Sequence, residues 1–172
     1  IDLIAHDPCR TETAHTIDLV LDTTPPAVTY TQPALAQYAT DEFAAIAYAV
    51  DDGPQGSGVA SESASFDGAG ATNGQILDMF FLEAGMHSVV VTATDNVGNT
   101  GTTERAFRVR ATAASLISNI DRARSLGLIT NNGAYNGIRA SLEAAQQSHL
   151  DGRHATERNQ LGTVVNQLEA KS

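Results

Sequence analysis

The stretch that most constrains the fold of this chain is residues 85–99, where an apolar strand pattern runs into a tight turn. Val89, Val91 and Ala93 recur at every second position, so a strand would place them on one face. β-Branched residues dominate the run, as a half-buried pleated surface prefers. The Asp-Asn-Val-Gly-Asn that follows supplies the side-chain caps and the positive φ of a tight turn. With a second strand-like run at residues 102–110, this pattern predicts a hairpin that closes an antiparallel domain.

Further strand patterns precede this hairpin, at residues 28–31, 43–50, 59–66 and 75–82. In the second of them Ile46, Tyr48 and Val50 alternate with alanines, so the period of two favours a strand despite the helix preference of alanine. Strands spaced by roughly ten residues, with turn signals between them, indicate an all-β sandwich.

Charge divides the chain into two unlike parts. Residues 1–110 carry 15 acidic and 4 basic side chains, a net of −11, whereas residues 111–172 carry 5 acidic and 6 basic ones, a net of +1. This asymmetry indicates two domains of different kinds. The larger part would repel phosphate, which argues against a nucleic-acid partner. The sequence has no apolar run of about 18 residues, so we expect no membrane insertion.

Residues 1–22 repeat the pattern of the hairpin described above. Ala5-His6-Asp7 matches residues 93–95, and the apolar run at 17–21 matches residues 106–110. We therefore expect residues 1–22 to be the closing hairpin of a preceding module; the alternative is an extra hairpin of the same domain. Its unpaired edges would pack on a neighbour or pair with another copy of the chain. Cys9 has no partner within the sequence, so it is either a small buried residue or pairs with an upstream cysteine.

Short motifs recur along residues 23–110 and the linker before them. They are Asp-Thr-Thr-Pro-Pro at 22–26, Ser-Gly-Val at 57–59, Asp-Gly at 67–68, Ala-Gly-Met-His at 84–87 and Ala-Thr-Asp-Asn-Val-Gly-Asn at 93–99. With these motifs, residues 23–110 resemble a bacterial immunoglobulin-like repeat of large secreted proteins. The resemblance implies an immunoglobulin-like β-sandwich after a stiff Pro-Pro linker. It implies no particular activity, because this fold hosts many roles.

Helix-forming residues take over at residue 111. Apolar residues recur at helical spacing in three runs, with breaks at Gly127 and at Asp151-Gly152, and Asn131-Asn132-Gly133 opens the second run. Three helices with short connections predict an antiparallel bundle. We expect the arginines to lie on the solvated faces of these helices: Arg122, Arg124, Arg139, Arg153 and Arg158. His149 and His154 flank the second break and are expected to be surface or capping groups.

The helical part carries three characteristic segments, at residues 127–133, 141–145 and 159–170. Through these segments, residues 113–171 resemble the small C-terminal FIMAH domain found at the end of secreted bacterial peptidases, phosphatases and polysaccharide-active enzymes. The chain departs from the family at Thr163-Val164-Val165, where the family has an aromatic residue followed by Ile. The resemblance brings no catalytic residues to this chain.

These patterns predict a closing hairpin at 1–22, an immunoglobulin-like β-sandwich at 23–110 and a FIMAH-like helical bundle at 111–172. We expect a non-catalytic accessory region of a large secreted bacterial protein, extracellular or at the cell surface, that spaces, stabilises or docks adjacent domains. One alternative is a glycan- or cell-surface-binding module, for which Tyr38 is the first aromatic to test. Another is a surface-assembly subunit that self-associates through residues 1–22. The histidines lack the spacing of a zinc protease, and the sequence has no nucleophile elbow, so neither motif supports an enzyme.

Carboxylates at three loops suggest a metal site. Antiparallel strand order would bring the loop at 51–58, the turn at 95–99 and the linker at 22 to one pole, facing the preceding module. This pole would gather the oxygen-rich set that Ca²⁺ requires, and the candidate ligands are Asp22, Asp51, Asp52, Asp95 and Asn99. The alternative is that these residues only cap turns.

Overall fold

The computed structural model describes residues 2–5, 13–16 and 21–169. Strand β1 (Asp2–Ala5) pairs antiparallel with β2 (Thr13–Thr16), so the N-terminal segment contains a hairpin. Cys9 and most of the second strand expected at 17–21 lie outside the described residues. The strand that pairs with β1 is β2, the more polar segment just before residues 17–21.

The larger sheet of the sandwich is built around the hairpin of β10 (Gly85–Asp95) and β11 (Thr100–Arg110). Strand β7 (Val59–Phe66) pairs antiparallel with β10, and β8 (Ala69–Ala71) covers the far edge of β7. The short β4 (Gln37–Ala39) runs parallel to β11, which gives the order β4-β11-β10-β7-β8. The predicted hairpin is therefore confirmed as the centre of the sheet.

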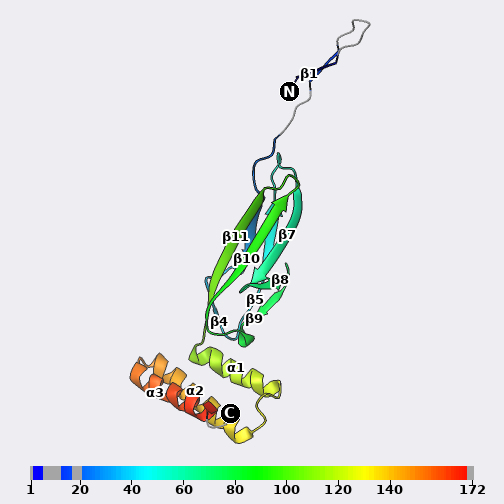
Figure 1. Cartoon of the computed structure of the whole chain (residues 1–172). Coiled ribbons are helices and arrows are strands. Elements are labelled where there is room, and N and C mark those ends of the chain that lie inside the picture. Colours follow the sequence, from blue (N-terminus) through cyan, green and yellow to red (C-terminus); the bar gives the residue numbers. More distant parts are fainter. Residues whose placement is uncertain (1, 6–12, 17–20, 170–172) are drawn as a thin grey trace.

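Two strand pairs form the opposite layer (Figure 1). Strand β3 (Ala27–Gln32) pairs with β6 (Ala47–Asp51), and β5 (Phe43–Ala45) pairs with β9 (Ile76–Asp78). The strand predicted at 43–50 is thus interrupted at Ile46, whose backbone bonds with Gln75 and Gly74 instead. The two layers make the β-sandwich that the sequence predicts.

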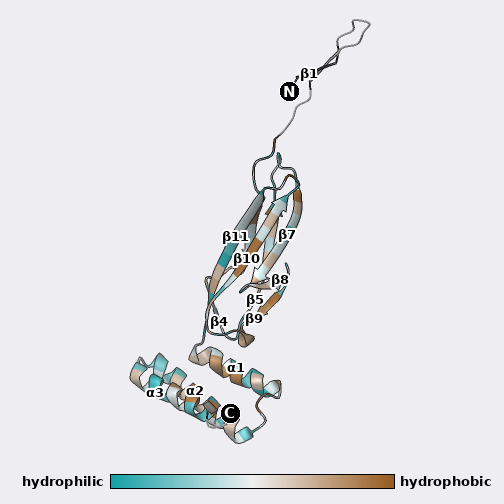
Figure 2. Ribbon diagram, in the orientation of Figure 1, coloured by the Kyte–Doolittle hydropathy of each residue, from teal (hydrophilic) through white to brown (hydrophobic). Residues whose placement is uncertain are grey.

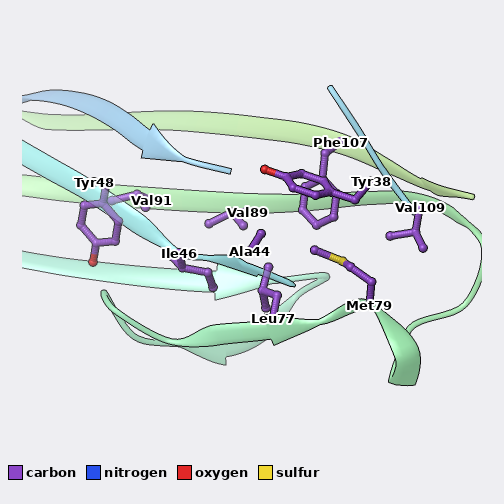
Figure 3. Close-up of a cluster of buried hydrophobic side chains, with 10 residues drawn as sticks. All are labelled: Tyr38, Ala44, Ile46, Tyr48, Leu77, Met79, Val89, Val91, Phe107 and Val109. Carbon is purple, nitrogen blue, oxygen red and sulfur yellow. The ribbon is translucent and has the colours of Figure 1, made fainter. Parts of the chain in front are cut away.

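The core between the layers is lined by alternate residues of the facing strands (Figure 3). Val89, Val91, Ala93 and Phe107 are completely buried, as the period of two predicts. Burial of each large apolar side chain stabilises the fold by about 1.5–3 kcal/mol. In Figure 2 the apolar character of β10 appears as brown, next to the teal along β11.

The strand predicted at residues 75–82 is wrong beyond Asp78. The chain forms a 3₁₀ turn, η1 (Met79–Phe81), because the Asp78 side chain caps it by accepting a hydrogen bond from the Phe80 backbone N–H at 3.2 Å. The turn keeps Met79 buried in the core and leaves Phe81 67% exposed. An apolar run alone could not distinguish this arrangement from a strand.

Three helices follow: α1 (Ala113–Ser125), α2 (Asn132–Leu150) and α3 (His154–Glu169). Thr112 and Ser115 form a capping box at the start of α1, and Asn131 caps α2. Gly127 and Gly152 take positive φ values of 75° and 70° just after α1 and α2, a conformation that costs glycine little. In Figure 1 the helices lie at the end of the sandwich opposite the linker at residue 22.

Helix α2 packs against both α1 and α3 around a small core of Ile138, Leu142 and Val164. Of the apolar stripe expected on α3, Val165 and Leu168 stay 51% and 48% exposed. Within the described residues, no helix is long and apolar enough to cross a membrane.

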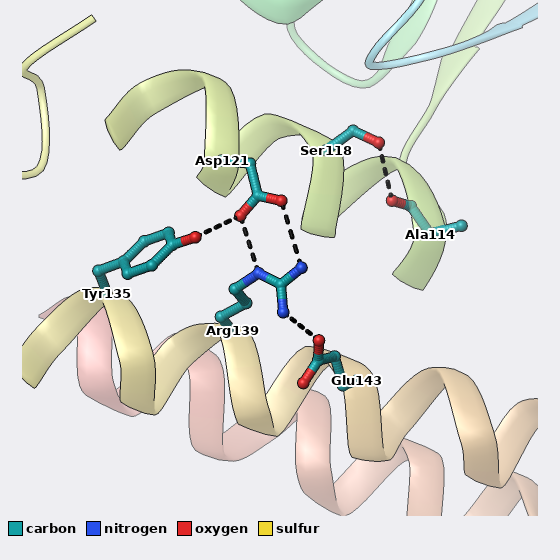
Figure 4. Close-up of polar contacts among 6 residues, drawn as sticks. All are labelled: Ala114, Ser118, Asp121, Tyr135, Arg139 and Glu143. Atoms are coloured by element: carbon teal, nitrogen blue, oxygen red, sulfur yellow. Dashed lines mark hydrogen bonds and ion pairs between the residues drawn. The ribbon is translucent and has the colours of Figure 1, made fainter. Parts of the chain in front are cut away.

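Polar contacts hold α1 to α2 (Figure 4). Asp121 of α1 accepts hydrogen bonds from Tyr135 Oη at 2.8 Å and Arg139 Nε at 2.9 Å, and Arg139 also pairs with Glu143. Arg139 and then Tyr135 lower the pKa of Asp121 through these bonds. Arg139 therefore connects two helices, and the expectation that it only covers a solvated face is wrong.

Candidate functional site

One end of the sandwich gathers three carboxylates, which we call the acidic pole: Asp22 of the linker, Asp52 of the loop after β6, and Asp95 at the end of β10. One carboxylate oxygen from each lies within 4.8 Å of the others. Asp95 is only 2% exposed, whereas Asp22 and Asp52 are half-buried. The predicted convergence of these three segments is therefore what the structure shows.

Asp95 organises the turn between β10 and β11. Its Oδ1 accepts three backbone N–H bonds, from Val97 at 2.9 Å, Gly98 at 2.7 Å and Asn99 at 2.8 Å. Its Oδ2 accepts a fourth from Asn99 Nδ2 at 2.7 Å. A buried carboxylate is tolerated when donors satisfy it in this way.

Asp22 ties the linker to the pole. Its Oδ1 accepts from the Thr24 N–H at 3.0 Å and its Oδ2 from the Ser57 N–H at 2.7 Å. These backbone bonds, the Thr24 one first, lower the pKa of Asp22. Asn99 Nδ2 also donates to the Asp22 carbonyl at 3.3 Å. The linker, the loop and the turn thus form one hydrogen-bonded unit.

Asp52 is the member of the pole whose hydrogen bonds are incomplete. Its Oδ2 accepts from the Gly58 N–H at 2.7 Å, but its Oδ1 is buried without a partner among the described residues, as is the hydroxyl of Ser57. The loop folds tightly enough that a Cβ at Gly56 would overlap the Asp52 carbonyl, so only glycine fits there. Buried polar atoms usually have partners, so a cation or water would complete this set.

The two remaining candidate ligands have other roles. Asp51 is exposed and accepts a hydrogen bond from the Gly53 N–H at 3.0 Å, which is a turn cap. Asn99 directs its amide nitrogen at Asp22 and Asp95, so it donates hydrogen bonds in this structure. Whether the pole binds Ca²⁺ stays a prediction.

The opposite end of the sandwich holds a second cluster, which we call the helix anchor: Arg122 of α1 with Asp78, Phe43, Phe80 and Phe81 of the sandwich. The Arg122 guanidinium makes a bidentate pair with Asp78, with Nη1 2.7 Å from Oδ1 and Nη2 on Oδ2. Its carbon Cζ lies 4.8–5.7 Å from the centres of the three rings. Bidentate pairing and stacking on aromatic rings are the contacts that arginine makes best.

A hydroxyl pair strengthens the same junction. Thr40 Oγ1 and Ser115 Oγ lie 2.9 Å apart, and both residues are buried. The expectation that Arg122 lies on a solvated face is therefore wrong, because its guanidinium pairs with Asp78. Only Asp78 beside two phenylalanines hinted at this junction, and that pattern does not identify a partner 44 residues away.

Tyr38, the aromatic first considered for glycan binding, is 5% exposed. Its ring packs edge-on against Phe107 at 5.5 Å, and its hydroxyl accepts hydrogen bonds from the Ala34 and Leu35 N–H groups. The idea that Tyr38 forms an exposed sugar platform is therefore wrong. The large exposed aromatics in the described residues are Phe43, 55% exposed, and Phe81, at the helix anchor.

Strand order and layers define the class: a β-sandwich followed by three helices. Searches of protein families and of curated proteins find no match. Among solved structures, the chain is similar to the fibronectin(III)-like modules of Clostridium thermocellum CbhA, with 15% identity, a TM-score of 0.38, and 63% of this chain and 60% of that chain covered.

The chain is also similar to SGBP-B of the Bacteroides ovatus mixed-linkage glucan utilization locus, solved in complex with a mixed-linkage heptasaccharide. That match has 15% identity and a TM-score of 0.35, and it covers 54% of this chain and 26% of that chain. Each match thus spans less than two thirds of the other protein. The resemblance of the helices to the FIMAH domain and the domain boundaries stay predictions.

Proposed function

We propose that this chain is a non-catalytic accessory region of a larger secreted bacterial protein and acts as a rigid connector. The observation that carries the proposal is that side-chain hydrogen bonds tie each end of the sandwich to the adjoining segment, the linker at one end and α1 at the other. Asp22 is bonded into one end of the sandwich, and Arg122 is held at the other. A flexible tether would leave these segments free of side-chain contacts. The connector would thus fix the distance and the orientation of adjacent parts.

¹⁵N relaxation of the full chain tests the connector. A rigid connector gives one rotational correlation time for amides of β10 and β11 and of α1 and α2. Two different correlation times would show that the sandwich and the helices tumble independently, and the connector proposal would then be wrong.

Ca²⁺ at the acidic pole would strengthen this role by cross-linking the linker to two loops of the sandwich. Three carboxylates with neighbouring carbonyls are ligands that Ca²⁺ accepts. The support is that Asp22, Asp52 and Asp95 converge and that one buried oxygen of Asp52 lacks a partner among the described residues. The alternative interpretation, turn capping, already accounts for Asp51 and for most bonds of Asp95.

Thermal unfolding with millimolar Ca²⁺ and with chelator separates these interpretations. A ligand that binds only the folded state at about 100 times its dissociation constant stabilises by about 2.7 kcal/mol. We expect Ca²⁺ to raise the Tm by several degrees in the wild type and in Asp51→Asn, and to have no effect in Asp52→Asn. Asp51 is the matched control, because it lies in the same loop and outside the pole. Equal Tm values with Ca²⁺ and chelator in the wild type would show that these aspartates only cap turns.

Glycan binding is the second candidate, favoured by the exposed rings of Phe43 and Phe81 and by Ile76, which is 63% exposed. Aromatic faces are common contacts for ligands that are apolar on one side. Affinity electrophoresis in gels containing mixed-linkage glucan tests it. Retardation that Phe43→Ala and Phe81→Ala abolish, and that Val97→Ala at the opposite end preserves, would support binding. Unretarded wild-type protein would reject this glucan as a ligand.

A further inference from the structure

The turn between α2 and α3 brings together two imidazoles and a carboxylate. His149 Nδ1 lies 3.1 Å and His154 Nδ1 lies 3.2 Å from the same atom, Oε2 of Glu157. The two rings meet edge to face, with centres 5.5 Å apart. All three ligand atoms lie within 4.8 Å of one another.

Local structure fixes these side chains on one side of the turn. His149 occupies the last turn of α2, and His154 and Glu157 are three residues apart on the first turns of α3, so their side chains share a face. The connection is held by backbone bonds, from the Arg153 N–H to the Ser148 carbonyl at 2.8 Å and from the Glu157 N–H to the Arg153 carbonyl at 3.0 Å. The three groups therefore face one another without rearrangement of the backbone.

The distances suit a tetrahedral transition-metal ion. Zn²⁺ binds imidazole nitrogen and carboxylate oxygen at about 2.0–2.1 Å, which places neighbouring tetrahedral ligands about 3.3–3.4 Å apart. The two observed N···O distances are within a few tenths of an ångström of that separation. Two nitrogens and one oxygen also favour Zn²⁺ over Ca²⁺, which prefers oxygen ligands throughout.

Charge and space at the turn are compatible with a bound cation. Glu157 supplies the carboxylate of the cluster, and its Oε2 faces both imidazoles. The nearby Arg153 guanidinium is paired with Asp151. A cavity of about 410 Å³ opens beside the cluster and is lined by His149, Glu157, Gln146 and Leu161, among others. It leaves room for a water molecule as a fourth ligand.

We propose that His149, His154 and Glu157 form a three-ligand Zn²⁺ site whose fourth position is open to this cavity. The expectation that both histidines are only surface or capping groups would then be incomplete. The site is separate from the acidic pole in position and in ligand chemistry. A bound ion would clamp the end of α2 to the start of α3.

Isothermal titration of the full chain with ZnCl₂ tests the site. We expect one equivalent of Zn²⁺ to bind the wild type, and His154→Ala and Glu157→Gln to weaken that binding at least tenfold, because even changes to supporting residues of metal sites weaken affinity by about 10- to 100-fold. Thr156→Ala is the control, since Thr156 is exposed on the same turn and lies outside the cluster. His154 is also exposed, so its replacement leaves the fold intact, which far-UV circular dichroism checks.

The site of any bound Zn²⁺ is identified by the imidazole resonances of the full chain. Selective shifts of His149 and His154, unchanged by excess Ca²⁺, support the proposal. Absence of binding up to submillimolar Zn²⁺, or equal affinity in the wild type, His154→Ala and Glu157→Gln, would overturn it.

Discussion

At the scale of single residues, the buried Asp95 holds the turn between β10 and β11 together through its side chain. Its carboxylate satisfies three backbone N–H groups of the β10–β11 turn and one amide of Asn99. Removing such an acceptor leaves buried donors without partners, which is more destabilising than losing the bonds alone.

We expect Asp95→Ala to lower the free energy of unfolding by about 3 kcal/mol, measured by urea denaturation. Asp51→Ala provides the comparison, because Asp51 accepts a single bond at an exposed turn, and we expect it to lose less than about 1 kcal/mol. Equal losses in the two variants would contradict the role assigned to Asp95.

His87 has a raised pKa in the folded protein. Burial against Phe66 and Phe107 disfavours its charged form, but hydrogen bonds to Asp67 Oδ2 at 2.6 Å and to the Glu83 carbonyl at 2.8 Å outweigh this effect and raise its pKa. Both ring nitrogens thus face acceptors, and only the imidazolium can donate to both.

Because the pKa of His87 is raised in the folded state, its contribution to stability is complete below the unfolded pKa of about 6.5 and is lost as pH rises through the folded value. We expect the free energy of unfolding to fall across this interval, by at most about 1.4 kcal/mol per pH unit for one proton. The slope should decrease in His87→Gln, measured by denaturant titration at several pH values. A slope that is unchanged in His87→Gln would refute the assignment.

At the scale of elements, the helix anchor decides whether α1 stays on the sandwich. We expect Arg122→Lys to increase amide hydrogen exchange in α1, because lysine keeps the charge but loses the bidentate pair with Asp78 and much of the ring stacking. Mass spectrometry of peptides from α1 measures this effect. Arg158→Lys, at an exposed position of α3, should leave exchange in α1 unchanged. If both variants exchange alike, the anchor is not what holds α1.

The elements could be predicted where local sequence decides them. The strand at 59–66 and the central hairpin follow from period-two patterns, and the breaks between the helices follow from Asn131 and the glycines. The η1 turn could not be predicted, because an apolar run that ends a strand looks like the strand itself. The break at Ile46 could not be predicted either, because the period-two pattern of residues 43–50 continues through it.

The candidate sites, too, could be predicted only in part. Asp22, Asp52 and Asp95 could be placed together from antiparallel strand order alone, whereas their hydrogen bonds depend on side-chain rotamers. The partnership of Arg122 and Asp78 depends on how a helix docks on a sheet, and the sequence carries no local signal of that.

At the scale of the whole molecule, we propose that the sandwich holds the acidic pole and the helices in a fixed relation. Double electron–electron resonance measures this relation directly, with spin labels at Gln55→Cys and Arg158→Cys in a Cys9→Ser background. Both labelled positions are exposed, one in the loop of the acidic pole and one on α3. We expect a single narrow distance distribution in this chain and a broad one when Arg122→Ala is added. A distribution that is already broad before Arg122 is replaced would contradict a rigid connector.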